Sequence, residues 1–249
     1  MTGSPASTVL LLHGLGSSTR DWSDQVPALT LHHDVLLVDL RGHGQSDRPP
    51  GPYSIREMAN DVAMLTEKLG FTGLHVVGLS MGAQVALQLA LDHPAVVSTI
   101  TVVNSPASMK PRRLRDKLTV LQRNLLVQVF GMRRVGQVIA SRLLPGDEFI
   151  ERRRIFAERW AENDPAAYRA SFDAILDWDI TPFLIGINQA ILVIAASEDY
   201  TPLEWKKRIV ELAPNATLMV VEGCRHAIPV ERPEAFNAIL LDFLDKHPQ

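Results

Sequence analysis

The chain contains one cysteine, Cys224, among its 249 residues. A single thiol cannot form an intrachain disulfide and excludes a zinc site built from cysteines. No apolar run approaches the roughly 20 residues that a membrane-spanning helix needs. The first residues lack the basic segment and the apolar stretch of a secretory signal. The net charge of −3 gives no basic excess that would attract nucleic acid. We therefore expect a cytoplasmic protein with no membrane span and no nucleic-acid partner. The oligomeric state stays open.

Short, continuous apolar runs recur along the chain, and helical patterns separate most of them. Continuous runs are typical of parallel strands that are covered on both faces. Ser54-Ile55-Arg56-Glu57 is a capping box that predicts a helix start, and Gly70 marks its end. Thr201-Pro202-Leu203-Glu204 repeats the start signal, with proline at the first helical position. The alternation predicts an α/β fold with a doubly wound, mostly parallel sheet of about six strands. The expected strands are Val9–Leu12, Val35–Val38, Leu74–Val77, Thr99–Val103, Ile191–Ala195 and Thr217–Val221.

The alternation stops between about residues 107 and 182, where the pattern is helical throughout. We predict an inserted, all-helical cap over 107–182, and a core made of 1–106 and 183–249. The cap holds 14 Lys and Arg against 10 Asp and Glu, a net charge of +4, which leaves −7 for the core. The favoured interpretation is a solvated helix face that pairs with the acidic core, and the alternatives are an anionic substrate or a charged membrane surface. Two apolar stripes mark the helices: Leu114, Leu118, Leu121 and Leu125, and Tyr168, Phe172, Ile175 and Leu176.

Gly78-Leu79-Ser80-Met81-Gly82 lies between an apolar run and a helical pattern. A strand, a sharp turn and a helix with a serine at the apex form a nucleophile elbow. The turn exposes the serine hydroxyl, and the close approach of strand and helix explains the glycines on either side. Ser80 is therefore the predicted nucleophile.

A serine hydroxyl needs a base, and the base needs an acid that fixes its tautomer. His226 follows the last predicted strand, and Asp199 follows the strand before it. The carboxyl ends of parallel strands meet at one edge of the sheet. The order Ser80, Asp199, His226 is the order expected for this elbow, which predicts a catalytic triad. Glu198 is the alternative acid.

An oxyanion hole needs two backbone N–H groups, and Met81 supplies the first. His13-Gly14-Leu15-Gly16 follows the first predicted strand, so the Leu15 amide is the candidate for the second. His13 is expected to hold this loop, and His13, Gly14, Trp22 and Arg225 are candidate substrate-binding residues. Trp22 fits the core equally well. The glycine-rich segment 39–47 lacks the lysine of a P-loop and is predicted to be a structural turn.

Together these residues resemble the α/β-hydrolase superfamily of serine hydrolases. The resemblance rests on His13-Gly14, the 41–46 turn, the Ser80 elbow, Asp199, and His226 with the Glu231-Arg232-Pro233-Glu234 segment. Small capped esterases, enol-lactonase-like enzymes and meta-cleavage C–C hydrolases are similar. The resemblance implies a triad under a helical lid, with no metal and no organic cofactor. The chain differs from it by Ala83 after the elbow, by Arg225 before the histidine, and by the apparent lack of a leading hairpin, which predicts a bare sheet edge.

The expected activity is hydrolysis of a small carboxylic ester through an acyl-enzyme on Ser80. An enol-lactone, a thioester or a C–C bond next to a ketone could be cleaved by the same site. A non-catalytic receptor for a small ligand is the alternative from another class. A redox role for Cys224 is not favoured, since a lone buried thiol usually packs.

Overall fold

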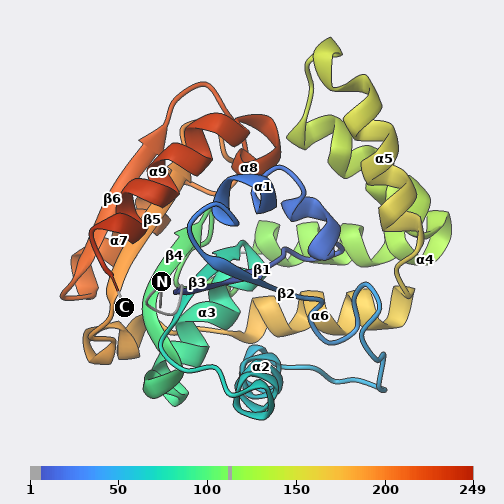
Figure 1. The fold of residues 1–249 in the computed structure, drawn as a ribbon. Coiled ribbons are helices and arrows are strands. Elements are labelled where there is room, and N and C mark those ends of the chain that lie inside the picture. Colours follow the sequence, from blue (N-terminus) through green and yellow to red (C-terminus); the bar gives the residue numbers. More distant parts are fainter. Residues whose placement is uncertain (1–6, 112–113, 249) are drawn as a thin grey trace.

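Six parallel strands form one sheet at the centre of the computed structural model, which describes residues 7–111 and 114–248 (Figure 1). The strand order is β2-β1-β3-β4-β5-β6. Each predicted run lies within a strand, so the prediction of a doubly wound parallel sheet of about six strands is confirmed. Within the described ranges, no strand pairs with the outer edge of β2. The strands are β1 (Thr8–Leu12), β2 (Asp34–Val38), β3 (Leu74–Leu79), β4 (Val97–Val103), β5 (Ala190–Ala196) and β6 (Ala216–Val221).

Helices cover both faces of this sheet. Because successive side chains of a strand point to opposite faces, Leu10 and Leu12 of β1 enter one apolar cluster, and Val9 and Leu11 enter the other. The first cluster includes residues of α2 (Ile55–Leu69), α3 (Met81–Asp92) and α7 (Leu203–Leu212). The second includes residues of α1 (Val26–Leu29), α8 (Ile228–Glu231) and α9 (Pro233–Asp245). The resulting three-layer arrangement leaves the carboxyl ends of the strands free to carry loops.

The two predicted capping signals have different outcomes. Ser54 caps α2, since its Oγ accepts a hydrogen bond from the Glu57 amide at 3.1 Å, and Gly70 ends the helix with φ 75°. The prediction at Thr201 is wrong. The α7 helix begins at Leu203, Pro202 is its N-cap, and no side chain caps it. The Thr201 hydroxyl instead donates to the Asp199 carboxylate, which is a stronger acceptor because it is charged.

Three long helices lie between β4 and β5, in the stretch for which a cap was predicted: α4 (Leu114–Leu143), α5 (Ile150–Ala161) and α6 (Pro165–Asp177). A β-bridge between Ser108 and Asp179 joins the two ends of this insertion. Gly131, with φ 71° and ψ 170°, interrupts the helical backbone of α4. No helix among the described residues is long and apolar enough to cross a membrane.

The two predicted apolar stripes differ in burial. On α6, Tyr168, Phe172, Ile175 and Leu176 are all buried. On α4, which the stripe predicted as a helix, the side chains of Leu118, Leu121 and Leu125 are exposed. The reason is that α4 packs through a later stretch, where Val127, Met132 and Val135 form a cluster with Trp160 and Tyr168. Leu114 lies in the helix, but its side chain is not among those that the structure describes.

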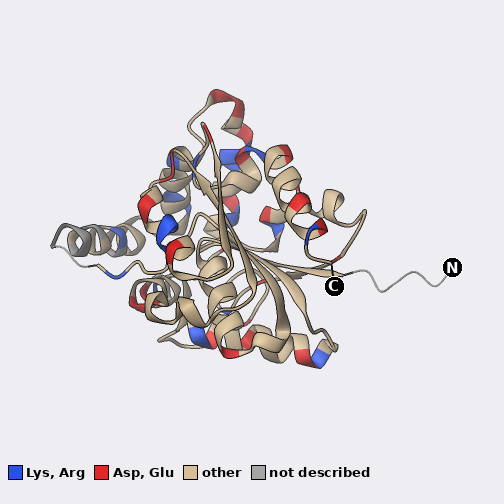
Figure 2. Ribbon diagram, turned by 90° about the vertical axis from the view of Figure 1, so that its left-hand side faces the viewer, with Lys and Arg blue, Asp and Glu red and all other residues tan. Residues whose placement is uncertain are grey.

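Ion pairs connect α5 and the residues just after it to the loop that follows β1. Arg152 contacts Asp24 at 2.6 Å, and Arg159 contacts Asp21 at 3.1 Å. This agrees with the interpretation that basic residues of the insertion pair with the acidic core. Figure 2 shows basic and acidic residues interspersed over the helices, while the strands carry almost none. A third pair, between Arg20 and Glu162, joins the same regions.

Candidate active site

Ser80 occupies a strained turn between β3 and α3. Its backbone has φ 54° and ψ −111°, a conformation that residues other than glycine rarely adopt. A hydrogen bond of 2.9 Å from its amide to the Val103 carbonyl ties the turn to β4. The residue is half-buried, so its hydroxyl is accessible at the carboxyl edge of the sheet. Strain of this kind is retained where the surrounding structure enforces it, and it clusters at functional sites.

The glycines at 78 and 82 allow this turn to pack closely. A Cβ on Gly78 would lie 2.3 Å from the backbone of Gly82, as the elbow pattern predicts. A Cβ on Gly82 would lie 2.1 Å from the Leu12 carbonyl oxygen, so that glycine makes room for β1 and not only for β3. The first turn of α3 is thereby pressed against the end of β1 and the loop that follows it.

His226 and Asp199 meet at the same edge, brought there by the loops after β6 and β5. The Nδ1 atom of His226 lies 2.8 Å from Oδ1 of Asp199. The Asp199 side chain is fully buried, and that of His226 is 9% exposed. The second carboxylate oxygen contacts the Thr201 hydroxyl and the Lys206 ammonium. The rival acid, Glu198, forms an ion pair with Arg225 at 2.6 Å.

The surroundings of Asp199 keep it ionised. Burial acts to raise its pKa, but the hydrogen bond and charge of His226 and the bonds from Lys206 and Thr201 outweigh burial and lower the pKa to about 2. An ionised carboxylate accepts hydrogen bonds only, so Nδ1 of the neutral His226 must carry the proton. Its Nε2 is then the free base.

The lowered pKa predicts how Asp199 contributes to stability. Since 2 lies below the ordinary value of 3.8, the ionised group stabilises the fold above about pH 4, and this contribution is lost as the pH falls toward 2. We expect wild type to exceed Asp199→Asn by about 2 kcal/mol in unfolding free energy above pH 5. Urea unfolding at a series of pH values measures this gap, which should narrow on acidification. A gap that is constant from pH 5 to pH 3 would contradict the prediction.

Tyr200 was not predicted from the sequence, yet its hydroxyl lies between the nucleophile and the base. The oxygen is 3.1 Å from Nε2 of His226, and the two ring centroids are 4.3 Å apart. The Ser80 side chain is a second hydrogen-bond partner of this hydroxyl. Burial of the hydroxyl and the nearby Asp199 raise the pKa of Tyr200, so the phenol is neutral and donates to Nε2. The residue as a whole is 62% exposed, because only its hydroxyl end is enclosed.

The loop after β1 runs beside Ser80. A Cβ on Gly14 would lie 3.7 Å from Cβ of Ser80, so the loop comes close to Ser80 at the residue before Leu15. Neither the Leu15 nor the Met81 amide has a hydrogen-bond acceptor among the residues that the structure describes. Met81 also opens α3, whose N-terminal end favours negative charge.

The remaining candidate residues have other partners. His13 is fully buried; its Nε2 accepts from the Leu40 amide at 2.9 Å, and its Nδ1 donates to the Gly14 carbonyl at 2.8 Å. It therefore holds the loop. Burial lowers its pKa, which keeps it neutral. Trp22 is 1% exposed and packs near Phe236 in the core. Arg225 contacts Glu198 and, more weakly, Glu231.

Asn104, which was not predicted from the sequence, connects the loops that carry the site. It follows β4 with φ 46°. Its amide group donates to the His226 carbonyl at 2.9 Å, and its Oδ1 accepts from the Ala196 amide at 2.8 Å. One side chain thus fixes the end of β5 relative to the histidine loop. An asparagine at the end of an apolar run was the only available signal.

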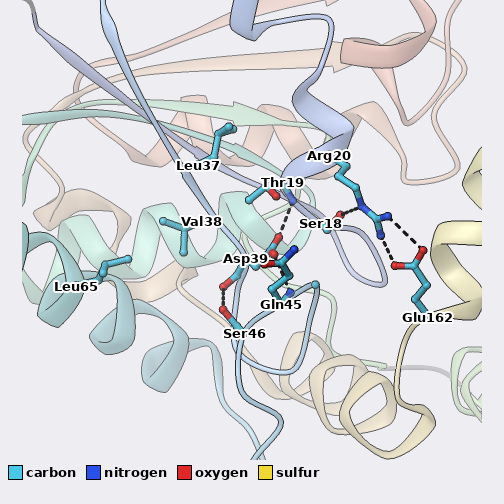
Figure 3. A pocket seen from close by; sticks show the side chains of 11 residues that line it. Ser18, Thr19, Arg20, Leu37, Val38, Asp39, Gln45, Ser46, Leu65 and Glu162 are labelled. Atoms are coloured by element: carbon cyan, nitrogen blue, oxygen red, sulfur yellow. Dashed lines mark hydrogen bonds and ion pairs between the residues drawn. The ribbon is translucent and has the colours of Figure 1, made fainter.

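A cavity beside β2 is separate from this cluster. It has a volume of about 520 Å³, and Ser18, Arg20, Asp39 and Gln45 are among the lining residues (Figure 3). The Asp39 carboxylate accepts from the Thr19 and Gln45 amides, which accounts for the structural turn predicted there. In the ranges 7–111 and 114–248, no group of three or more His, Cys, Asp or Glu could hold a metal ion.

Comparison with known proteins identifies the family and the fold. A family model described as the alpha/beta hydrolase fold matches residues 7–233. A protein provisionally named carbamate hydrolase RutD, from Caulobacter sp. (strain K31), is 34% identical over 97% of this chain and 93% of its own. The enol-lactonase from Burkholderia xenovorans LB400 superposes with a TM-score of 0.89 at 26% identity, covering 98% of this chain and 94% of that one. A thermophilic esterase from Thermogutta terrifontis shares the fold, with a TM-score of 0.87 at 23% identity over 98% and 92% of the two chains. The chain belongs to the α/β-hydrolase fold family, and it is a hydrolase.

Proposed function

We propose that this hydrolase cleaves small carboxylic esters through an acyl-enzyme on Ser80, beneath a lid formed by the helices between β4 and β5. One observation carries the proposal. Three segments distant in sequence converge on a single hydrogen-bonded chain, in which Asp199 holds His226 at 2.8 Å and the Tyr200 hydroxyl is shared by His226 and Ser80.

The reaction follows from the roles of these groups. His226 takes the Ser80 proton at Nε2 while Oγ attacks the ester carbonyl. The amides of Leu15 and Met81 donate to the oxyanion of the tetrahedral intermediate, and Asp199 stabilises the imidazolium. His226 then protonates the leaving alcohol. Water attacks the acyl-enzyme by the same steps and releases the acid.

Tyr200 sets a condition for the first step. Its hydroxyl occupies the acceptor position on Nε2 that Ser80 needs. The side chain must therefore turn aside before the proton moves directly from Ser80 to His226. Because most of the residue is exposed, the ring can rotate without disturbing the core.

A carbamate is the second candidate substrate, favoured by the name given to the relative that is 34% identical over nearly the whole chain. A carbamate also presents a carbonyl to Ser80, but nitrogen donates electrons into the resulting carbamoyl-enzyme and slows its hydrolysis. A lactone is the third, in view of the enol-lactonase that is 26% identical. Turnover of p-nitrophenyl acetate, p-nitrophenyl N-methylcarbamate and an enol-lactone would rank the three.

Labelling with a fluorophosphonate tests the mechanism itself. The reagent phosphonylates an activated serine, and mass spectrometry of a digest locates the adduct. We expect one adduct, on Ser80, with a parallel loss of esterase activity. No adduct on Ser80 would refute the proposed function and favour a receptor that only holds its ligand.

A further inference from the structure

A buried ammonium group lies directly behind the candidate triad. Lys206, on the first turn of α7, has a fully buried side chain. Its Nζ is 2.5 Å from Oδ2 of Asp199 and 2.8 Å from the Thr201 carbonyl. The other oxygen of Asp199, Oδ1, is the one that holds His226. The Asp199 carboxylate thus contacts the candidate base through Oδ1 and a cation through Oδ2.

This arrangement is more than a Ser-His-Asp relay requires. In such a relay the acid needs only to hold the imidazole and stabilise its charged form. Burying a lysine is costly, and an apolar side chain in its place is often neutral or better for stability. Burial lowers the pKa of Lys206, and the Asp199 carboxylate opposes that shift. Asp199 is itself ionised at neutral pH, and its carboxylate 2.5 Å away favours the ammonium form of Lys206.

We propose that Lys206 is a positioning residue that acts on His226 through Asp199. It fixes the orientation of the carboxylate and offsets its charge, which preserves the free base to lower pH. The inference rests on the proposed function of the triad. The direction of the expected effect of Lys206 on the protonation of His226 follows from electrostatics. A carboxylate beside the imidazole favours the protonated, inactive form, and a cation on the far side of that carboxylate reduces the effect.

The other charged or titratable groups near His226 have hydrogen-bond or ion-pair partners other than Lys206, so we expect them to stay in place when Lys206 is changed. Tyr200 faces Nε2 and is neutral, and Arg123 of α4 is a more distant charge that acts on the Tyr200 hydroxyl. Arg225 is paired on the outer side of the loop. If the acid side of the pH profile of kcat/KM shifts when Lys206 is changed, the shift is then attributable to the cation behind Asp199. Of these groups, Asp199 and Tyr200 contact the imidazole of His226 directly.

The test compares pH profiles of kcat/KM for p-nitrophenyl acetate in wild type and three variants. Lys206→Met removes the charge, Lys206→Arg keeps it, and Thr201→Val removes an uncharged donor to the same oxygen. We expect the acid limb of Lys206→Met to move up by about one pH unit, as for loss of one charge at this range. Its kcat should fall roughly tenfold with KM within about twofold, because the side chain does not touch substrate. Lys206→Arg and Thr201→Val should keep the wild-type limb.

The inference is overturned if the Lys206→Met limb coincides with that of wild type, or if Lys206→Arg moves the limb as far as Lys206→Met does. Circular dichroism checks that each variant is folded. Should the methionine variant not fold, Lys206→Gln, which keeps a donor but no charge, replaces it under the same criteria. Failure of the proposed function is distinguishable, because it would appear in wild type as an unlabelled Ser80, before any change at Lys206.

Discussion

Replacing Ser80 with alanine should lower kcat/KM for p-nitrophenyl acetate by about four to six orders of magnitude. The loss is large because His226, Asp199 and the oxyanion amides act only on a bond that the Ser80 oxygen has attacked. The fold should be retained, since Ser80 is half-buried at the sheet edge and its side chain bonds to the exposed Tyr200 and not within the apolar core. Steady-state kinetics with circular dichroism on the same sample measures both quantities.

The matched control is Ser141→Ala, on the exposed surface of α4, where the hydroxyl bonds only to the Val138 carbonyl of its own helix. That variant should keep wild-type kinetics. A Ser80→Ala enzyme that retains more than about one-hundredth of the activity would exclude Ser80 as the nucleophile, because a triad without its nucleophile keeps far less.

Gly82→Ala should be strongly destabilising. The new Cβ would lie 2.1 Å from the Leu12 carbonyl oxygen and 2.7 Å from that of His13. Both neighbours are backbone atoms at the end of β1, so no flexible side chain can move away. We expect a loss of at least about 3 kcal/mol in unfolding free energy. In a chain of this size that corresponds to a fall of roughly 10 °C in Tm.

Gly186→Ala is the control for this prediction. A Cβ at Gly186 meets nothing within 4 Å, and its backbone is not left-handed. Its Tm should therefore stay within about 3 °C of wild type. Because the oxyanion loop begins where the clash falls, any folded Gly82→Ala protein should also lose activity. Equal melting temperatures for the two variants would show that the backbone at the end of β1 can shift at little cost in free energy, contrary to the packing described above.

The sheet and the order of the candidate catalytic residues along the chain could be predicted from local patterns. Continuous apolar runs determine parallel strands because both faces must be covered. The Ser80 elbow is a local motif whose two glycines are required by close backbone contacts. Asp199 and His226 were identified from their places after the last two strands, because parallel strands bring such positions to one edge. In the structure Asp199 lies 2.8 Å from His226, and the Tyr200 hydroxyl links His226 to Ser80.

What escaped the sequence depends on packing between distant elements. Thr201 matched a helix cap, but the carboxylate of Asp199 was near enough to compete for its hydroxyl. Leu118, Leu121 and Leu125 have helical spacing, yet spacing does not say whether another surface covers the face. Tyr200 and Lys206 look like ordinary residues of a loop and a helix, and their roles arise only where the loops after β5 and β6 converge.

The sequence by itself determined the α/β class, the number of strands, the strained serine turn and the membership of the candidate triad, because each depends on short-range pattern or on strand order. Only the tertiary structure decided which oxygen of Asp199 holds His226, that a buried lysine holds the other, and that a tyrosine hydroxyl lies between base and nucleophile. Those contacts join residues through directions and distances of a few ångströms, which the linear order of a chain does not specify.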